Sequence, residues 1–201
     1  MGLKNRLYFK EIILSILRKF REFDWTALSR DLLFVITAVF IFVSVSKIAL
    51  GLYTPMVAVE SGSMLPHIRI GDIIFVESID RTEVITNEAG KKMDYLSFNE
   101  YGDVILYKPR GNDKATPIIH RAMYYINENE PMWPGGPLAP YAGYITKGDN
   151  TRTNAAFDQQ GSISPGLPVK KEWVIGVARF GRVPMLGCIS LIPRGNFACF
   201  K

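Results

Sequence analysis

The chain has 201 residues, of which 48% are hydrophobic and 21% are charged. At roughly 100–200 residues per domain, this length allows one main domain plus an appendage, and the hydrophobic fraction excludes a wholly disordered chain. A formal net charge of +5 permits an anionic partner without indicating one. Two cysteines and two histidines are too few for a disulfide scaffold or a histidine-rich metal centre. We therefore expect no metal, no cofactor and no nucleic-acid partner.

Residues 1–30 form a basic segment, with seven lysines and arginines against three acidic residues. Apolar side chains recur at helical spacing over residues 9–23, and the charges lie on the other face. This pattern predicts an amphipathic helix. Such a helix either lies on anionic lipid at the membrane interface or packs on a partner or on the root of the next segment.

An uncharged run of 15 residues extends from Leu32 to Ser46, and apolar residues continue beyond Lys47. A helix needs about 20 apolar residues to cross a bilayer, a length that 32–53 reaches if the Lys47 ammonium extends to the interface. We predict a transmembrane helix within 31–54, with a buried core helix as the alternative. Basic residues precede the span and none occurs in 48–68, so the N-terminus is predicted to be cytosolic. A cleaved signal peptide fits less well, because the charged lead is long and no small-x-small site closely follows.

The remaining residues, 55–201, are predicted to form one extracytoplasmic, mainly β domain, sandwich-like or barrel-like, with long loops. No helical period of useful length occurs after residue 60, and residues 86–98 are interpreted as a loop or hairpin. The predicted strands are β-branched or aromatic runs bounded by turn residues, and they cover 73–78, 104–109, 117–126, 141–148 and 173–180.

A candidate nucleophile lies shortly after the predicted span, in Ser61-Gly62-Ser63-Met64-Leu65-Pro66. A glycine beside a serine lets the backbone fold sharply, so that the hydroxyl and an adjacent N–H face the same side. A nucleophile with an oxyanion donor needs this arrangement. Taken alone the motif is weak, because the same residues are common in ordinary turns.

Read with four later segments, this motif resembles the catalytic-serine box of the type I signal peptidases. The later segments that resemble boxes of the same family follow in the family's order and cover residues 102–105, 117–121, 146–150 and 183–187. The resemblance implies a membrane-anchored serine endopeptidase that removes signal peptides from secreted preproteins. It assigns Ser63, which directly precedes Met64, as the nucleophile.

The residue before Arg121 subdivides this family. The usual bacterial branch has lysine there, whereas this chain has His120 and so resembles the archaeal and endoplasmic-reticulum branch, which implies a Ser–His pair. Neutral imidazole can accept a hydroxyl proton near pH 7, and a guanidinium cannot. A Ser–Lys dyad is the alternative, although none of the remaining candidates occupies the family's base position; these are Lys108, Lys114 and Lys147.

The other members of the predicted site are less well defined by the sequence. Ser61 is interpreted as a bystander or an oxyanion donor through its hydroxyl, beside Gly62, and Met64 as packing under the site. Asp149 and Asp158 are the candidate acids. Relatives often carry a second aspartate about six residues after the first, where this chain has an alanine. We favour Asp158 as the residue that orients the histidine and Asp149 as a turn residue; otherwise one of the two functions is absent.

Three residues are left with open or ordinary interpretations. His67, on the loop after the nucleophile motif, is interpreted as a surface residue. Cys188 and Cys199 are expected either to form a disulfide outside the membrane or to be apolar thiols near it. The apolar segment 181–192 could lie against lipid but is too short and too interrupted by glycine and proline to be a confident span.

The resemblance also implies partners and a location. Preproteins are expected to bind as extended strands along a sheet edge, with 56–62 and 73–78 as walls and small side chains before the cut. The other expected partners are the lipid bilayer and the translocation machinery or accessory subunits. The expected location is the plasma membrane or the endoplasmic-reticulum membrane. Two other classes stay open: a non-catalytic subunit of a secretion complex, and a self-cleaving Ser–Lys regulatory protease of the repressor type.

Overall fold

The computed structural model describes residue 14 and residues 24–200. The predicted amphipathic helix over 9–23 and most of the basic segment therefore lie outside the described residues. The chain divides into two compact units, residues 1–45 and residues 46–201.

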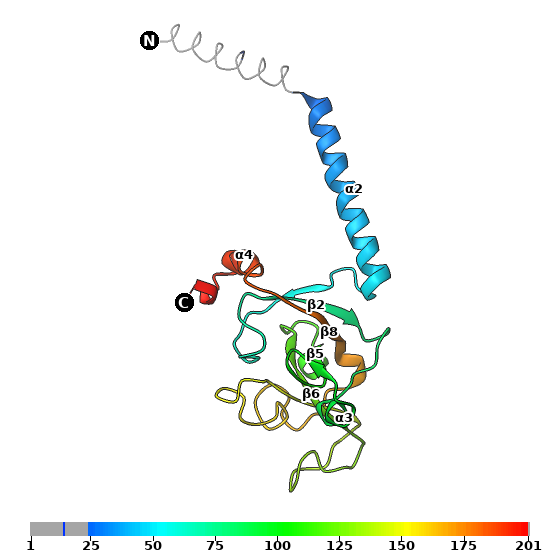
Figure 1. The fold of residues 1–201 in the computed structure, drawn as a ribbon, viewed down its shortest axis with the longest axis vertical. Helices are drawn as coiled ribbons and strands as arrows, with labels where there is room; N and C mark the ends of the chain where they lie inside the picture. The colour runs from blue at the N-terminus through cyan, green and yellow to red at the C-terminus, as the bar shows by residue number, and fades with distance from the viewer. Residues whose placement is uncertain (1–13, 15–23, 201) are drawn as a thin grey trace, which may run out of the picture. The chain divides into compact units, whose positions relative to one another are not determined.

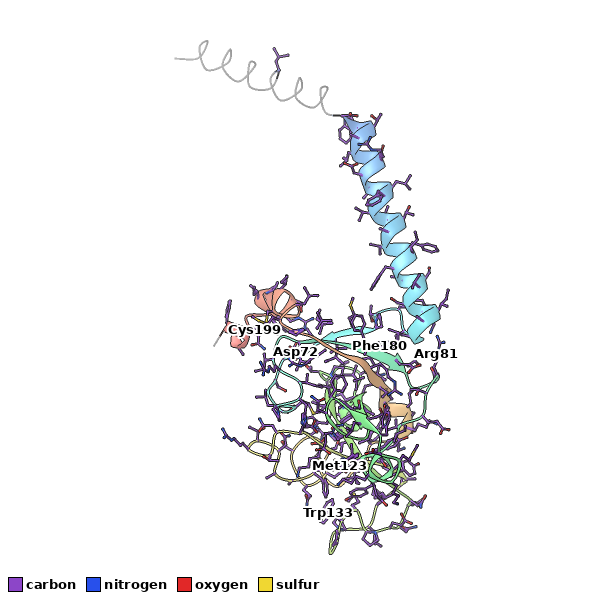
Figure 2. All side chains as sticks on the ribbon, viewed as in Figure 1. Asp72, Arg81, Met123, Trp133, Phe180 and Cys199 are labelled. Atoms are coloured by element: carbon purple, nitrogen blue, oxygen red, sulfur yellow. A yellow bond between two sulfur atoms is a disulfide. The ribbon has the colours of Figure 1, made fainter. Side chains whose placement is uncertain are left out.

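The predicted apolar helix is present as α2, Trp25–Leu50 (Figure 1). Asp24 caps its N-terminus, since Oδ1 accepts the N–H groups of Thr26 and Ala27 at 3.0 Å. The side chains of the helix are drawn in Figure 2; most of its apolar ones are exposed, and only Ser46 and Leu50 are buried. The alternative of a buried core helix is therefore not supported. By its length and composition α2 is able to cross a membrane.

The end of α2 lies in the second unit and is fixed by polar contacts. The Lys47 ammonium donates to the carbonyl of Gly51 at 2.8 Å and lies 5.0 Å from the centre of the Tyr53 ring. Gly51 takes a left-handed conformation with φ of 74°, so the helix ends before the predicted boundary near Tyr53. Arg81 donates to the carbonyl of Ile48, which ties this last turn to the loop after the strand Ile73–Ser78 (β2).

The second unit is built on a six-stranded antiparallel sheet in the order β1-β2-β8-β5-β6-β7 (Figure 1). Its strands are β1 Met56–Ala58, β2 Ile73–Ser78, β5 Val104–Tyr107, β6 Ile118–Ile126, β7 Gly143–Lys147 and β8 Val174–Val183. All five predicted strands are present, and the mainly β fold is confirmed. Among the described residues no pairing joins β1 to β7, so this is an open sheet rather than a closed barrel.

The interpretation of residues 86–98 as a loop or hairpin was wrong in its first half. A helix, α3 Asn87–Met93, precedes a small hairpin of β3 Leu96–Ser97 and β4 Glu100–Tyr101. Thr86 caps α3 by accepting the N–H of Ala89 at 3.3 Å. At seven residues the helix is too short to show a hydrophobic period. The short 3-10 helices are η1 Pro109–Gly111, η2 Lys171–Trp173, η3 Ile192–Arg194 and η4 Ala198–Phe200.

The sheet is covered on both faces at its centre. All four residues of β5 are buried. Val104 belongs to one hydrophobic cluster, together with Met64 and Ala178, whereas Ile105 and Tyr107 belong to another. Because successive side chains of a strand point to opposite faces, these two clusters mark the two faces of the sheet. A continuous apolar run is expected of such a strand.

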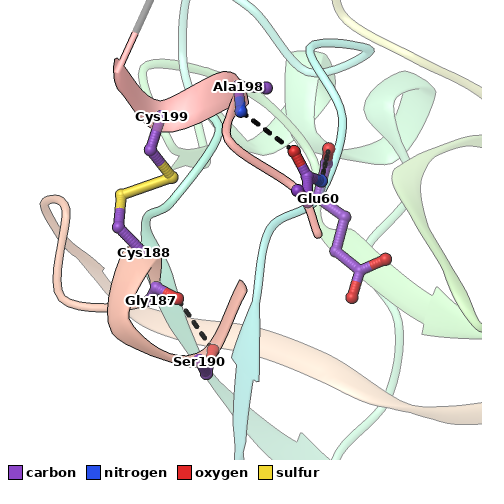
Figure 3. Close-up of a disulfide and its surroundings, with 7 residues drawn as sticks. Glu60, Gly187, Cys188, Ser190, Ala198 and Cys199 are labelled. Carbon is purple, nitrogen blue, oxygen red and sulfur yellow. Dashed lines mark hydrogen bonds between the residues drawn. A yellow bond between two sulfur atoms is a disulfide. The ribbon is translucent and has the colours of Figure 1, made fainter. Parts of the chain in front are cut away.

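The C-terminal segment is closed on itself by a disulfide between Cys188 and Cys199, whose Cα atoms are 6.0 Å apart (Figure 3). The bond resolves the two alternatives left open for these cysteines. It closes the segment that contains α4, Cys188–Leu191. The Gly187 N–H donates to the Gly71 carbonyl at 2.9 Å, and Arg194 pairs with Glu60, just before the nucleophile motif.

Gly176 tests the close pairing of β2 with β8. A Cβ at this position would lie 2.1 Å from the carbonyl oxygen of Glu77 on the neighbouring strand. We expect Gly176→Ala to lower the free energy of unfolding by about 1–3 kcal/mol, or about 2–4 °C per kcal/mol in a thermal melt. Gly161→Ala is the matched control, because its nearest neighbours would be 3.8 and 3.9 Å away. Equal melting temperatures for the two variants would contradict the expected clash.

Candidate active site

The nucleophile motif forms a compact turn in which Met64 is buried. The Leu65 N–H donates to the Gly62 carbonyl at 3.2 Å, and the Leu65–Pro66 peptide bond is cis. Met64 is fully buried and packs with Val59, Ile68, Ile74, Val104 and Ala178. The hydroxyls of Ser61 and Ser63 are 3.3 Å apart and hydrogen-bonded. The packed methionine therefore holds the serine at the surface of the turn.

The turn after β7 clamps the backbone of this motif. Asn150 donates its N–H to the Ser63 carbonyl and its amide Nδ2 to the Gly62 carbonyl, both at 2.8 Å. Gly148 is needed at this approach, because a Cβ there would lie 2.6 Å from the Ser63 carbonyl oxygen. The segment 146–150 thus fixes the loop that carries the candidate nucleophile.

His120 lies on β6 opposite Ile105 of β5, and its side chain is 2% exposed. Its Nδ1 is 2.8 Å from Oδ2 of Asp158. The same carboxylate oxygen accepts the Tyr107 hydroxyl at 2.8 Å and the Thr146 hydroxyl at 2.6 Å. A carboxylate with three donors can fix the orientation of the imidazole ring.

The electrostatics of this group keep Asp158 ionised. Burial raises the pKa of its carboxyl, but the hydrogen bond and the attraction of His120, with the hydroxyls of Thr146 and Tyr107, outweigh burial, so the pKa lies below its ordinary value. Burial, reinforced by the charge of Asp158, raises the pKa of Tyr107 well above its ordinary value. Tyr107 therefore stays a neutral donor near pH 7.

Arg121, the next residue of β6, points to the other face and meets the second acid. Its Nε donates to Oδ1 of Asp149 at 2.9 Å and its Nη2 to Oδ2 at 2.6 Å. The two side chains are 1% and 6% exposed. His67 also contacts this carboxylate, with Nδ1 2.8 Å from Oδ2. His67 was interpreted only as a surface residue, and the sequence did not predict this contact.

The structure thus distributes the predicted site residues over two hydrogen-bonded groups. One joins His120 to Asp158, and the other joins Asp149 to Arg121 and His67. Within the described part of the chain, the Ser63 hydroxyl is hydrogen-bonded to Ser61 and not to the histidine. Catalytic hydrogen bonds are often long in unliganded enzymes and tighten when substrate binds.

Two of the three lysines of the alternative dyad are engaged elsewhere. The Lys108 ammonium is 2.5 Å from Oδ1 of Asp113, and the Lys147 ammonium donates to the Ala155 carbonyl at 2.8 Å. These contacts favour the histidine as the base. In the described residues no group of three histidine, cysteine or acidic side chains is placed to hold a metal ion.

The sequence reasoning did not identify the residues that donate hydrogen bonds to Asp158 and to the nucleophile loop. Tyr107 and Thr146 donate to Asp158, and Asn150 binds the nucleophile loop. For Thr146 and Asn150 a signal was present, because both lie in the segment 146–150 that resembles a family box. Tyr107 had no such signal beyond its place within the predicted strand 104–109.

The antiparallel β domain, the apolar helix before it and the buried histidine–carboxylate pair agree with the expected class, a serine peptidase. No family model matches the chain. The signal peptidase complex catalytic subunit SEC11 of Zygosaccharomyces rouxii is 29% identical over 163 residues, which cover 80% of this chain and 78% of that protein. Its counterpart of the same name in Saccharomyces cerevisiae is 28% identical over 169 residues, 83% of each chain. The chain is thus similar to these catalytic subunits over most of its length, which confirms the resemblance drawn from the motifs.

Asp149→Asn is expected to destabilise the fold, because it leaves the buried Arg121 guanidinium without its counter-charge. Breaking a buried pair in this way costs about 3–5 kcal/mol. Asp113→Asn is the matched control, since Asp113 is 77% exposed and its change should stay within about 0.5 kcal/mol. Thermal or denaturant unfolding measures both, and equal stabilities would show that the Arg121 pair contributes nothing.

Because the pKa of Asp158 is lowered in the folded chain, the free energy of unfolding should depend on pH in the acid range. A carboxyl whose folded pKa is below its unfolded value of about 3.9 stabilises the fold above that pH and loses this contribution as the pH falls through the folded pKa. We expect the melting temperature of the wild type to fall more steeply below about pH 4 than that of Asp158→Asn. If the melting temperatures of the wild type and of Asp158→Asn fall equally as the pH is lowered, the carboxylate does not have this role.

Proposed function

We propose that the chain is a membrane-anchored serine endopeptidase that removes signal peptides from secreted preproteins, with Ser63 as nucleophile and His120 as general base. The observation that carries this proposal is the buried His120–Asp158 pair, since its Nδ1 and Oδ2 are 2.8 Å apart. A neutral imidazole that donates from Nδ1 to a carboxylate leaves Nε2 as the proton acceptor.

In the proposed first step, Nε2 of His120 removes the proton of the Ser63 hydroxyl as this oxygen attacks the scissile carbonyl. The resulting imidazolium is stabilised by Asp158 and then gives its proton to the leaving amine. Water next attacks the acyl-enzyme, again with His120 as base, and releases the signal peptide and free Ser63. For the first attack the serine hydroxyl has to turn from Ser61 toward the imidazole.

The oxyanion is proposed to accept the N–H of Ser63 and the hydroxyl of Ser61. Their hydroxyls are within 3.3 Å of each other, so both side chains face the same space. Removal of one such donor typically costs about 2.7–4 kcal/mol in the transition state. Gly62, between the two serines, adds no side chain to this space. The buried side chain of Met64 anchors the turn in the core.

The substrate is proposed to add along the edge of the sheet next to β1, with 56–62 and 73–78 as walls. β1 is the outer strand on that side, and its backbone is paired only with β2 in the described sheet. An extended peptide can pair with such an edge through its main chain, while shallow pockets select small side chains. Ser61 and Ser63 follow directly after this strand.

We further propose that residues 1–30 are cytosolic, that 31–54 span the membrane once and that 55–201 lie outside the cytosol, at the plasma membrane or the endoplasmic-reticulum membrane. The disulfide of Cys188 and Cys199 supports this topology, because such bonds persist in oxidising compartments and are rare in the cytosol. The relatives are named as subunits of a complex, which supports accessory subunits as partners. The translocation machinery is proposed as a further partner, together with the bilayer and secretory preproteins.

Ser63→Ala and His120→Ala are each expected to abolish cleavage of a preprotein by the purified chain in detergent, while the melting temperature stays near that of the wild type. Asp158→Asn should lower kcat by about ten-thousandfold if this carboxylate fixes the tautomer of the base. Gel analysis of product against time measures all three rates. Full activity of His120→Ala, combined with loss in Lys108→Ala or Lys147→Ala, would replace the Ser–His assignment with a Ser–Lys dyad. A folded wild type without activity would favour the non-catalytic subunit.

A further inference from the structure

A second histidine–carboxylate contact lies on the nucleophile loop itself. Nδ1 of His67 is 2.8 Å from Oδ2 of Asp149, and the side chains are 21% and 6% exposed. His67 lies only a few residues after Ser63, within the same compact turn. The general acid–base chemistry proposed above makes no use of this imidazole.

The backbone of His67 is joined to the nucleophile through one carbonyl group. The N–H groups of His67 and Ile68 both donate to the Met64 carbonyl at 3.0 Å. Met64 directly follows Ser63, and its side chain is fully buried in a packed cluster. Because close-packed interiors transmit displacements rather than absorb them, a shift of His67 reaches Met64 and the serine.

The other end of the contact is rigid. Asp149 accepts hydrogen bonds from Nε and Nη2 of the buried Arg121. Arg121 directly follows His120 on β6. His67, Asp149 and Arg121 therefore form a continuous bonded path from the nucleophile loop to the strand that carries the base. Asn150 holds the start of the loop at Ser63, whereas His67 holds its end.

We propose that His67 is a positioning residue, whose Nδ1–H bond to Asp149 sets the placement of the Ser63 loop against the strand that bears His120. This inference rests on the proposed peptidase function and deepens it. Reacting groups have to be held within a narrow range of distance, and a misplacement of about 1 Å can lower a rate by about a hundredfold. A loop fastened at both ends keeps the serine within that range.

Three variants of His67 separate the hydrogen bond from the volume of the ring. The side-chain nitrogen of Asn takes the place of Nδ1, that of Gln takes the place of Nε2, and Phe fills the volume without a donor. In preprotein cleavage by the full-length chain in detergent, we expect His67→Gln and His67→Phe to lower kcat about ten- to hundredfold. KM and the melting temperature should stay near wild-type values, and His67→Asn should retain most of the wild-type kcat.

Three results would overturn the proposal: wild-type kcat in all three variants, a loss in His67→Asn equal to that in His67→Phe, or losses that follow the melting temperature. If the wild type does not cleave a preprotein, the proposed function fails, and His67 is judged by hydrogen exchange over residues 61–68 and at Asn150. Faster exchange in His67→Phe but not in His67→Asn supports the positioning role. Unchanged exchange in both contradicts it.

Discussion

Two consecutive residues of β6, a histidine and an arginine, have to be buried on opposite faces of one sheet, each against its own carboxylate. The pairing of Ile105 with His120 and of Val104 with Arg121 fixes which side chain faces which side. A slip of one residue would exchange the faces and leave both acids opposite the wrong partner. Since a buried charge without its partner costs several kcal/mol, this register is the constraint on which the site depends.

The segment that ends β7 serves both faces. Thr146, within the strand, donates to the carboxylate beside the imidazole, whereas Asp149 and Asn150, just after it, bind the guanidinium and the nucleophile loop. A short stretch of chain thereby couples the base, the buried cation and the serine. The site is assembled by backbone contacts between loops as much as by the proposed reacting groups themselves, and such contacts preorganise it.

The strands and the apolar helix could be predicted from the sequence because their signals are local: β-branched runs between turn residues, and a long uncharged stretch. Helix α3 was not predicted because the sequence indicates it only at its ends, by the capping Thr86 and the lysines of its last turn. It shows no hydrophobic periodicity. The ordered motifs identified the candidate nucleophile and base. The contacts of the two acids could not be derived in the same way, because Asp149 and Asp158 lie close together in sequence and only the fold separates their partners. The contact of His67 with Asp149 could not be predicted either, because it joins residues 82 positions apart.

The bond between Cys188 and Cys199 has a practical consequence. The two sulfur atoms lie against Gly71, and the peptide that they close pairs through Arg194 with Glu60, the residue before the nucleophile motif. Figure 3 shows Glu60 and the disulfide. Recombinant chain made inside a bacterial cytoplasm, or kept in dithiothreitol during purification, will lack this closure. Such a preparation can retain its central sheet and yet present a loosened wall next to Ser61, so the oxidation state of the sample belongs among the conditions recorded with every rate.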